Sequence, residues 1–224
     1  MRALAPTIAP TIAPTRASMI AALALGLLAL APLGSSAAAE PDRTAARAAI
    51  SELALEERAA FVDGAFEVLK RTRRPAAARD LSTAIEAAWS VAPNAEAQAL
   101  RDRAAAALAA DELEAARRAL DELLAAAPGF ADAWRLSAEL RARERDGAGA
   151  LADSEAALTL EPRDWRALLL RAEIFERQDR SGFAEAARSA ARAANPWASE
   201  LRPTAPTAPT APGAPGADRP PIEL

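Results

Sequence analysis

One regularity constrains this chain more than any other feature, because residue types recur every thirty-four positions between residues 97 and 198. A proline closes each unit, at Pro128, Pro162 and Pro196. Three further slots keep the same phase: a large apolar residue at Leu100, Trp134 and Leu168, a small residue at Ala104, Ala138 and Ala172, and a midway alanine at Ala116, Ala150 and Ala184. Three units in phase indicate a repeat protein, in which each unit buries its apolar face against its neighbours.

Each slot has a physical role in a pair of helices. The large residue and the apolar residues after it, spaced as i, i+4 and i+7, lie on one face of a first helix and fill the groove between two antiparallel helices. The small residue lets the two helices approach closely. The proline ends the second helix, because it has no N–H to donate and disfavours helical backbone at the residue before it. The pattern therefore predicts two helices in every unit.

The period and its slots together resemble the tetratricopeptide repeat. The third unit matches best, since Leu168, Ala172 and Phe175 stand where that family has large, small and aromatic residues. The resemblance implies an all-α fold: a right-handed superhelical array of antiparallel helix hairpins, or α–α solenoid. The three repeats would span residues 97–130, 131–164 and 165–198.

The first 39 residues are typical of a targeting segment. Arg2 and Arg16 precede an apolar run over residues 19–33, and small residues follow that run. The run is shorter than the roughly 20 residues that a membrane span needs. A signal peptide cleaved after Ala39 is therefore the favoured interpretation, and an uncleaved N-terminal anchor is the alternative.

Two other segments flank the repeats. The helical spacing of apolar residues in 40–96 predicts a group of N-terminal helices. The first of these helices is either continuous or broken near Val62. A degenerate repeat over 62–93, preceded by a cap over 42–60, would cover the exposed end of the array. Residues 201–224 are rich in Pro, Thr and Ala, which cannot bury a core, so they predict an extended, disordered tail.

The composition excludes many kinds of catalysis. The chain has no cysteine and no histidine, so it lacks a thiolate nucleophile, an imidazole base and the usual ligands of zinc or haem. It has no glycine-rich phosphate loop and no nucleophile elbow. Adjacent acids such as Glu56 and Glu57 are typical of solvated helix faces. We therefore predict a non-enzymatic protein with no cofactor and no metal.

The charge pattern argues against nucleic acid as a partner. The net charge is −4, and the densest basic cluster, Lys70 to Arg74, directly precedes Pro75. Cations favour the C-terminal end of a helix, which explains such a cluster without a ligand. A site for an anionic partner is the alternative, although no aromatic residues interleave the cluster. Membrane contact is expected only through the N-terminal segment, if that segment stays uncleaved.

The resemblance places a binding groove on the concave face, along the first helix of each pair. The residues expected to face it are Gln98, Arg101, Asp132, Arg135, Glu139, Arg166, Leu169 and Glu173. Arg101, Arg135 and Arg166 would form a basic ladder whose guanidinium groups suit carboxylates, so a peptide or protein partner with acidic groups is favoured. The alternative is that Glu139 and Glu173 pair with the neighbouring arginines.

These expectations combine into one hypothesis of function. The chain is predicted to be an adaptor or scaffold that is exported to the cell envelope, periplasmic or secreted, and binds a peptide or protein on its concave face. The alternative is an assembly subunit tethered to the inner membrane by an uncleaved N-terminal anchor.

Overall fold

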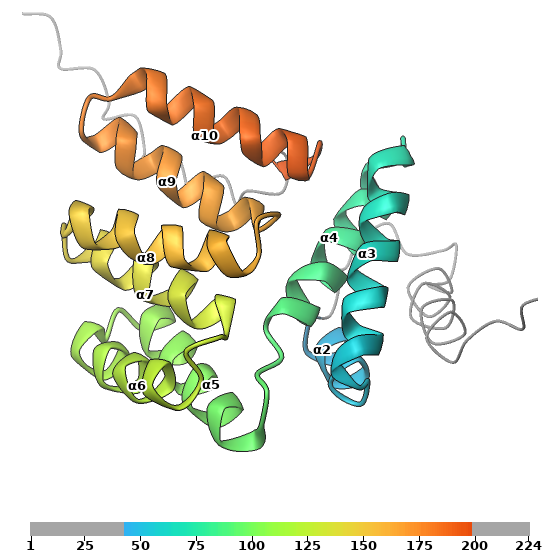
Figure 1. Cartoon of the computed structure of the whole chain (residues 1–224), viewed down its shortest axis with the longest axis horizontal. Coiled ribbons are helices and arrows are strands. Elements are labelled where there is room, and N and C mark those ends of the chain that lie inside the picture. Colours follow the sequence, from blue (N-terminus) through green and yellow to red (C-terminus); the bar gives the residue numbers. More distant parts are fainter. Residues whose placement is uncertain (1–42, 199–224) are drawn as a thin grey trace, which may run out of the picture.

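The computed structural model describes residues 43–198, and within this range every regular element is a helix (Figure 1). The helices are α2 (Arg43–Ser51), α3 (Leu55–Arg71), α4 (Pro75–Trp89), α5 (Ala95–Ala109), α6 (Leu113–Ala126), α7 (Ala131–Arg143), α8 (Gly147–Leu160), α9 (Trp165–Arg177) and α10 (Ser181–Ala194). The all-α prediction is confirmed for these residues. The predicted signal segment over 1–39 and the predicted tail over 201–224 lie outside them.

The last six helices form three hairpins that are stacked on one another (Figure 1). Helix α5 pairs with α6, α7 with α8, and α9 with α10. Each second helix also packs on the first helix of the next hairpin, α6 on α7 and α8 on α9. Packing therefore follows chain order, as expected where each unit buries its apolar face against the next one.

The same turn joins the two helices in each of these three hairpins. The second of its three residues has a left-handed backbone, with φ of 59° at Asp111, 65° at Arg145 and 57° at Asp179, at intervals of thirty-four residues. The next N–H donates to a carbonyl five residues back, at 2.8 Å for Glu112 to Ala107, 2.9 Å for Asp146 to Arg141 and 2.9 Å for Arg180 to Phe175. This arrangement satisfies carbonyls that the helix end would otherwise leave unpaired. The backbone conformation of the turn therefore repeats with the same period as the sequence.

Small residues and arginines hold neighbouring helices together. The periodic alanines named above at 104, 138, 172, 116, 150 and 184 are all at most 1% exposed. Two arginines thirty-four residues apart then join successive hairpins. Arg143 Nη1 donates to the carbonyl of Leu108 at the end of α5, at 2.6 Å, and Arg177 Nη1 donates to the carbonyl of Ala142 at the end of α7, at 3.2 Å. A cation at a helix C-terminus also complements the helix dipole.

The N-terminal helices form a second group. Helices α3 and α4 make a hairpin, and α2 packs on α4. The break that the sequence left open near Val62 is absent, because α3 runs from Leu55 to Arg71 without interruption. The chain breaks instead at residues 52–54, between α2 and α3. Gly64, inside α3, has no neighbouring atom within 4 Å of an added Cβ, so no close contact requires a glycine there.

This N-terminal group lies along the side of the stack (Figure 1). Its core continues into the last hairpin through three aromatic rings, Phe66, Trp89 and Trp165, with centroids 5.8 Å apart for Phe66–Trp165 and 4.8 Å for Trp89–Trp165. Asn195 Nδ2 donates to Ser82 Oγ at 3.0 Å, and both side chains are buried. The residues predicted as a cap and a degenerate repeat therefore share a core with α9 and α10.

Candidate functional site

A buried carboxylate joins the three arginines of the predicted ladder. Asp132, in the first turn of α7, has a side chain that is 0% exposed. Arg101 of α5 approaches it to 2.9 Å, Arg135 of α7 to 2.8 Å, and Arg166 of α9 to 3.3 Å. We call these four residues the Asp132 network. It connects the first helices of all three hairpins, so the ladder arginines have a common acceptor inside the chain.

Opposite charges in the network stabilise the ionised forms of Asp132 and Arg166. Burial alone would raise the pKa of Asp132, but the three arginines and the hydrogen bond from Arg135 outweigh burial and hold this pKa well below its usual range. Burial would likewise lower the pKa of Arg166, but the nearby acids, Asp164 first among them, raise it above its usual value. Both shifts favour the ionised forms, so Asp132 and Arg166 carry opposite charges at physiological pH.

The remaining predicted residues extend the network at both ends. Gln98 donates to Asp102 at 3.2 Å and accepts from the N–H of Ala92 at 2.8 Å. Glu139 contacts Arg135 at 3.3 Å and Arg143 at 2.7 Å. Each of these side chains has a partner within its own chain.

In the third hairpin, the residues predicted to face the groove contact their own helix or the N-terminal helices. Glu173 contacts Arg177 at 3.7 Å, on the next turn of the same helix. Leu169 is partly buried and packs against the core cluster that contains Phe66 and Trp165. Arg166 places its guanidinium 5.3 Å from the ring centre of Trp89 on α4. Helix α4 therefore covers part of the face on which the repeat pattern places the groove.

Sequence reasoning missed two acids of this site. Asp102 of α5 contacts Arg47 of α2 at 2.6 Å and Arg101 at 3.3 Å. Asp164 contacts Arg166 through two pairs of atoms, each at 3.2 Å, and also accepts from the first N–H groups of α9. The second role could have been found, since aspartate directly before an apolar helix is a usual N-cap. Nothing in the local pattern indicates Arg47 as the partner of Asp102.

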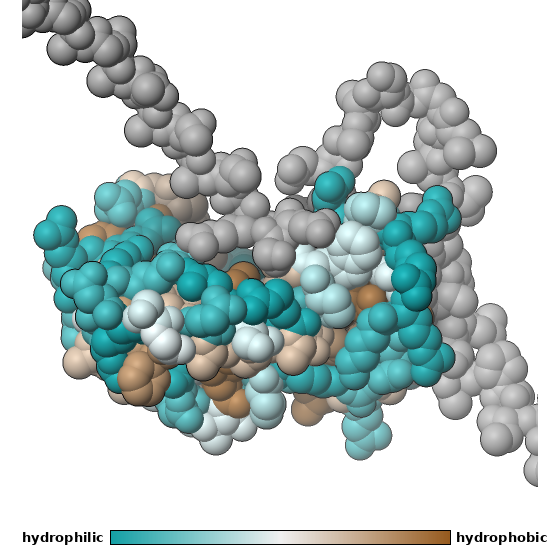
Figure 2. Space-filling view, turned by 90° about the horizontal axis from the view of Figure 1, so that it is seen from above, coloured by the Kyte–Doolittle hydropathy of each residue, from teal (hydrophilic) through white to brown (hydrophobic). Residues whose placement is uncertain are grey.

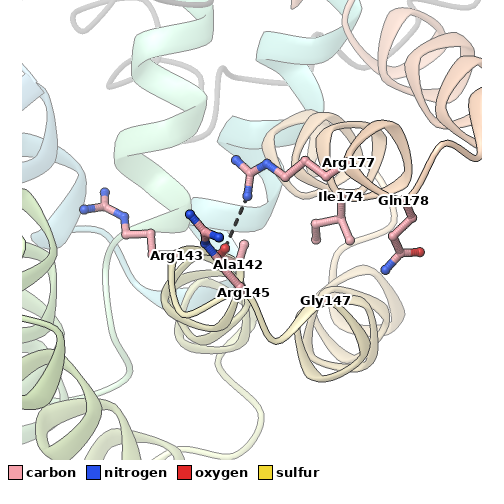
Figure 3. A pocket seen from close by; sticks show the side chains of 7 residues that line it. All are labelled: Ala142, Arg143, Arg145, Gly147, Ile174, Arg177 and Gln178. Atoms are coloured by element: carbon pink, nitrogen blue, oxygen red, sulfur yellow. Dashed lines mark hydrogen bonds between the residues drawn. The ribbon is translucent and has the colours of Figure 1, made fainter.

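A separate hollow of about 630 Å³ lies at the C-terminal ends of α7 and α9 (Figure 3). Its floor is apolar, from Ala142 and Ile174, and its polar lining is Arg143, Arg145, Arg177 and Gln178. Figure 3 shows Arg177 reaching across the hollow to the carbonyl of Ala142. Arg143 and Arg177 thus also join successive hairpins, as described above.

The fold and the Asp132 network define an all-helical protein of stacked hairpins joined by ion pairs. Among residues 43–198, no three His, Cys, Asp or Glu side chains are grouped so that they could hold a metal ion. Within the same range no helix has the length and apolar character of a membrane span. No family model and no curated protein matches the chain.

The depressed pKa of Asp132 predicts a loss of stability in acid. In the unfolded chain this carboxyl takes its ordinary value of 3.8, whereas the folded protein holds it lower. Above that value the carboxyl is ionised in both states and its contribution is complete; as the pH falls below it, the unfolded state binds the proton first and stability decreases. Urea unfolding at pH 7 and near pH 3 is expected to show this decrease. In Asp132→Asn the decrease should be smaller, and an unchanged decrease would contradict the assignment.

Proposed function

We propose that this chain is a non-enzymatic interaction protein of the tetratricopeptide-repeat type, a right-handed array of helix hairpins that binds a peptide or protein partner. One observation supports the repeat assignment above all others. The same left-handed turn, buried alanine and, in two hairpins, bridging arginine recur at thirty-four residues. Hairpins repeated in this way present their first helices on one continuous surface, which is how such arrays bind extended partners.

The proposed binding surface is the face of α5, α7 and α9 that carries the Asp132 network. The side chains exposed there have both signs of charge: Asp102 is 40% exposed, Glu139 32% and Arg143 36%. The ladder arginines are only 12–19% exposed and are bonded to acids of the chain. We therefore expect a partner segment with both acidic and basic groups, which complements the exposed charges and not the arginines alone.

Binding is tested by capture with immobilised protein of residues 40–224 from envelope extracts. The Glu139→Lys variant is expected to lose the captured partner, because it reverses a half-exposed charge at the centre of the surface. The matched control is Glu114→Lys on α6, an exposed acid on a second helix. Capture of the same proteins by both variants would contradict the proposal. Alanine at the ladder arginines is a poor test, since it leaves Asp132 buried without partners.

Export is a separate part of the proposal and depends on residues 1–39, outside the described range. Cell fractionation with mass determination tests it. A soluble envelope protein that begins near Glu40 is the expected result. Protein that keeps the segment and stays with membranes after a salt wash would favour the tethered alternative instead.

A further inference from the structure

A cleft of about 280 Å³ lies between α3 and the turns that precede α7 and α9. Its lining includes Leu55 at 74% exposure and Leu160 at 44%, two of the four large hydrophobic side chains that are exposed within residues 43–198. Figure 2 shows a mostly hydrophilic surface on the face it presents, with apolar residues in small separate patches. Two exposed leucines on one cleft are therefore a local concentration of apolar surface. We call this site the α3 cleft.

The α3 cleft also contains an unused donor. Arg58, one turn after Leu55 on α3, donates from Nη1 to the carbonyl of Val91 at 3.2 Å. Its Nε is buried and, within the described residues, is the one buried side-chain nitrogen or oxygen without a hydrogen-bond partner. A buried donor left unpaired costs free energy, so such a group is a candidate for contact with a ligand.

The acids around the cleft are already paired. Asp132 has its three arginines, and Asp164 has Arg166 and the first N–H groups of α9. Glu161 accepts from the indole of Trp89 at 3.1 Å and from Arg163 at 3.0 Å. Arg58 is therefore the charged group of the cleft with an unmet hydrogen bond. The chemistry that fits is a short apolar segment that carries a carboxylate.

We propose that residues Ile222-Glu223-Leu224 of this same chain dock in the α3 cleft, with Ile222 and Leu224 on its leucines and Glu223 on Arg58. They are the large apolar residues that follow Leu201, and they enclose an acid. The contact goes beyond the proposed function, since it is made within one chain and needs no partner. It would shield the apolar surface of the cleft and exclude other peptides from it.

The chain is long enough for this contact. Ala198 is 1% exposed and belongs to the core cluster that contains Phe66, and Trp89, which packs against this cluster, also lines the cleft. The segment thus starts beside the N-terminal helices. The 23 residues between Ala198 and Ile222 reach about 70 Å when extended. A tether of this kind gives a local concentration on the order of millimolar, so a weak site suffices for substantial occupancy.

Because the chain has no cysteine, a spin label at Ala217→Cys reports on this contact directly. In ¹⁵N-labelled protein of residues 40–224, the label is expected to broaden the amide signals of Leu55, Ala59 and Leu160. Exposed Ala148 on α8 provides the reference signal. The Glu223→Gln substitution should lower the docking equilibrium constant about tenfold and weaken the broadening, because it replaces a charged hydrogen bond by a neutral one.

Matched variants control each side of the contact. Asp218→Asn makes the same kind of change four residues before Ile222 and should leave the broadening intact. On the cleft, Leu55→Ser should abolish it, whereas Val68→Ser, at another exposed apolar residue of α3, should not. Equal broadening in Glu223→Gln and Asp218→Asn would overturn the proposal. So would broadening that appears only when spin-labelled chains are mixed with separate ¹⁵N-labelled chains, because the contact would then lie between copies.

Discussion

Asp132→Ala is expected to lower the free energy of unfolding by about 3–5 kcal/mol, the usual cost of removing one partner from a buried ion pair. The substitution leaves Arg101, Arg135 and Arg166 close together with no shared acceptor, although their side chains are only 12–19% exposed. Because the three arginines lie on three hairpins, the substitution should lower the stability of all three. Urea unfolding followed by circular dichroism measures it.

The matched control for this prediction is Asp121→Ala on α6. Asp121 is exposed, and a surface substitution of this kind usually changes stability by no more than about 0.5 kcal/mol. Similar losses in both variants would mean that the Asp132 network does not hold the first helices together. A large loss of unfolding free energy in Asp132→Ala alone would support the view that the ladder arginines stabilise the fold.

Trp165→Ala is expected to cost about 3–5 kcal/mol, the range for truncating a large aromatic residue in a core. Trp165 is 1% exposed and contacts both Phe66 and Trp89, so it is a large apolar link between the N-terminal helices and the last hairpin. Its loss should weaken that junction before it weakens the hairpins. Hydrogen exchange is therefore expected to accelerate in α3 and α4 more than in α5 and α6.

Trp134→Ala serves as the comparison of equal size. Trp134 is only half-buried, and its indole donates to the carbonyl of Pro128 at 2.8 Å, within its own hairpin region. We expect a smaller loss of stability and no selective acceleration in α3 and α4. If both tryptophan variants accelerate exchange equally in these helices, the proposed junction is wrong.

Most of the helices could be predicted from the sequence, because helix formation depends on nearby residues. The spacing of apolar residues, the alanines and the prolines act within one hairpin or between adjacent ones. The turns follow the same period, at Asp111, Arg145 and Asp179. The break in the first N-terminal helix was misplaced, since the sequence near Val62 and Gly64 is compatible with a continuous helix and the structure keeps α3 unbroken.

The candidate site could be predicted only in part. The repeat pattern placed Arg101, Asp132 and Arg135 on one predicted face, and in the structure the two arginines contact Asp132. The pairing of Glu139 with neighbouring arginines, given as an alternative, is present. Which charges meet depends on the offset between hairpins, and the period alone does not specify that offset. The convergence of three arginines on one carboxylate was therefore not predicted.

What the sequence by itself determined is the set of hairpins and their order, because each hairpin is encoded by contacts that recur every thirty-four residues. What only the tertiary structure decided is where the N-terminal helices lie. Trp165 stands in the slot that holds Ala97 and Ala131 in the other units, and the structure gives the reason, since this position meets Phe66 and Trp89. Phe66 and Trp89 lie 99 and 76 positions before Trp165 in the sequence, so no local pattern records these contacts.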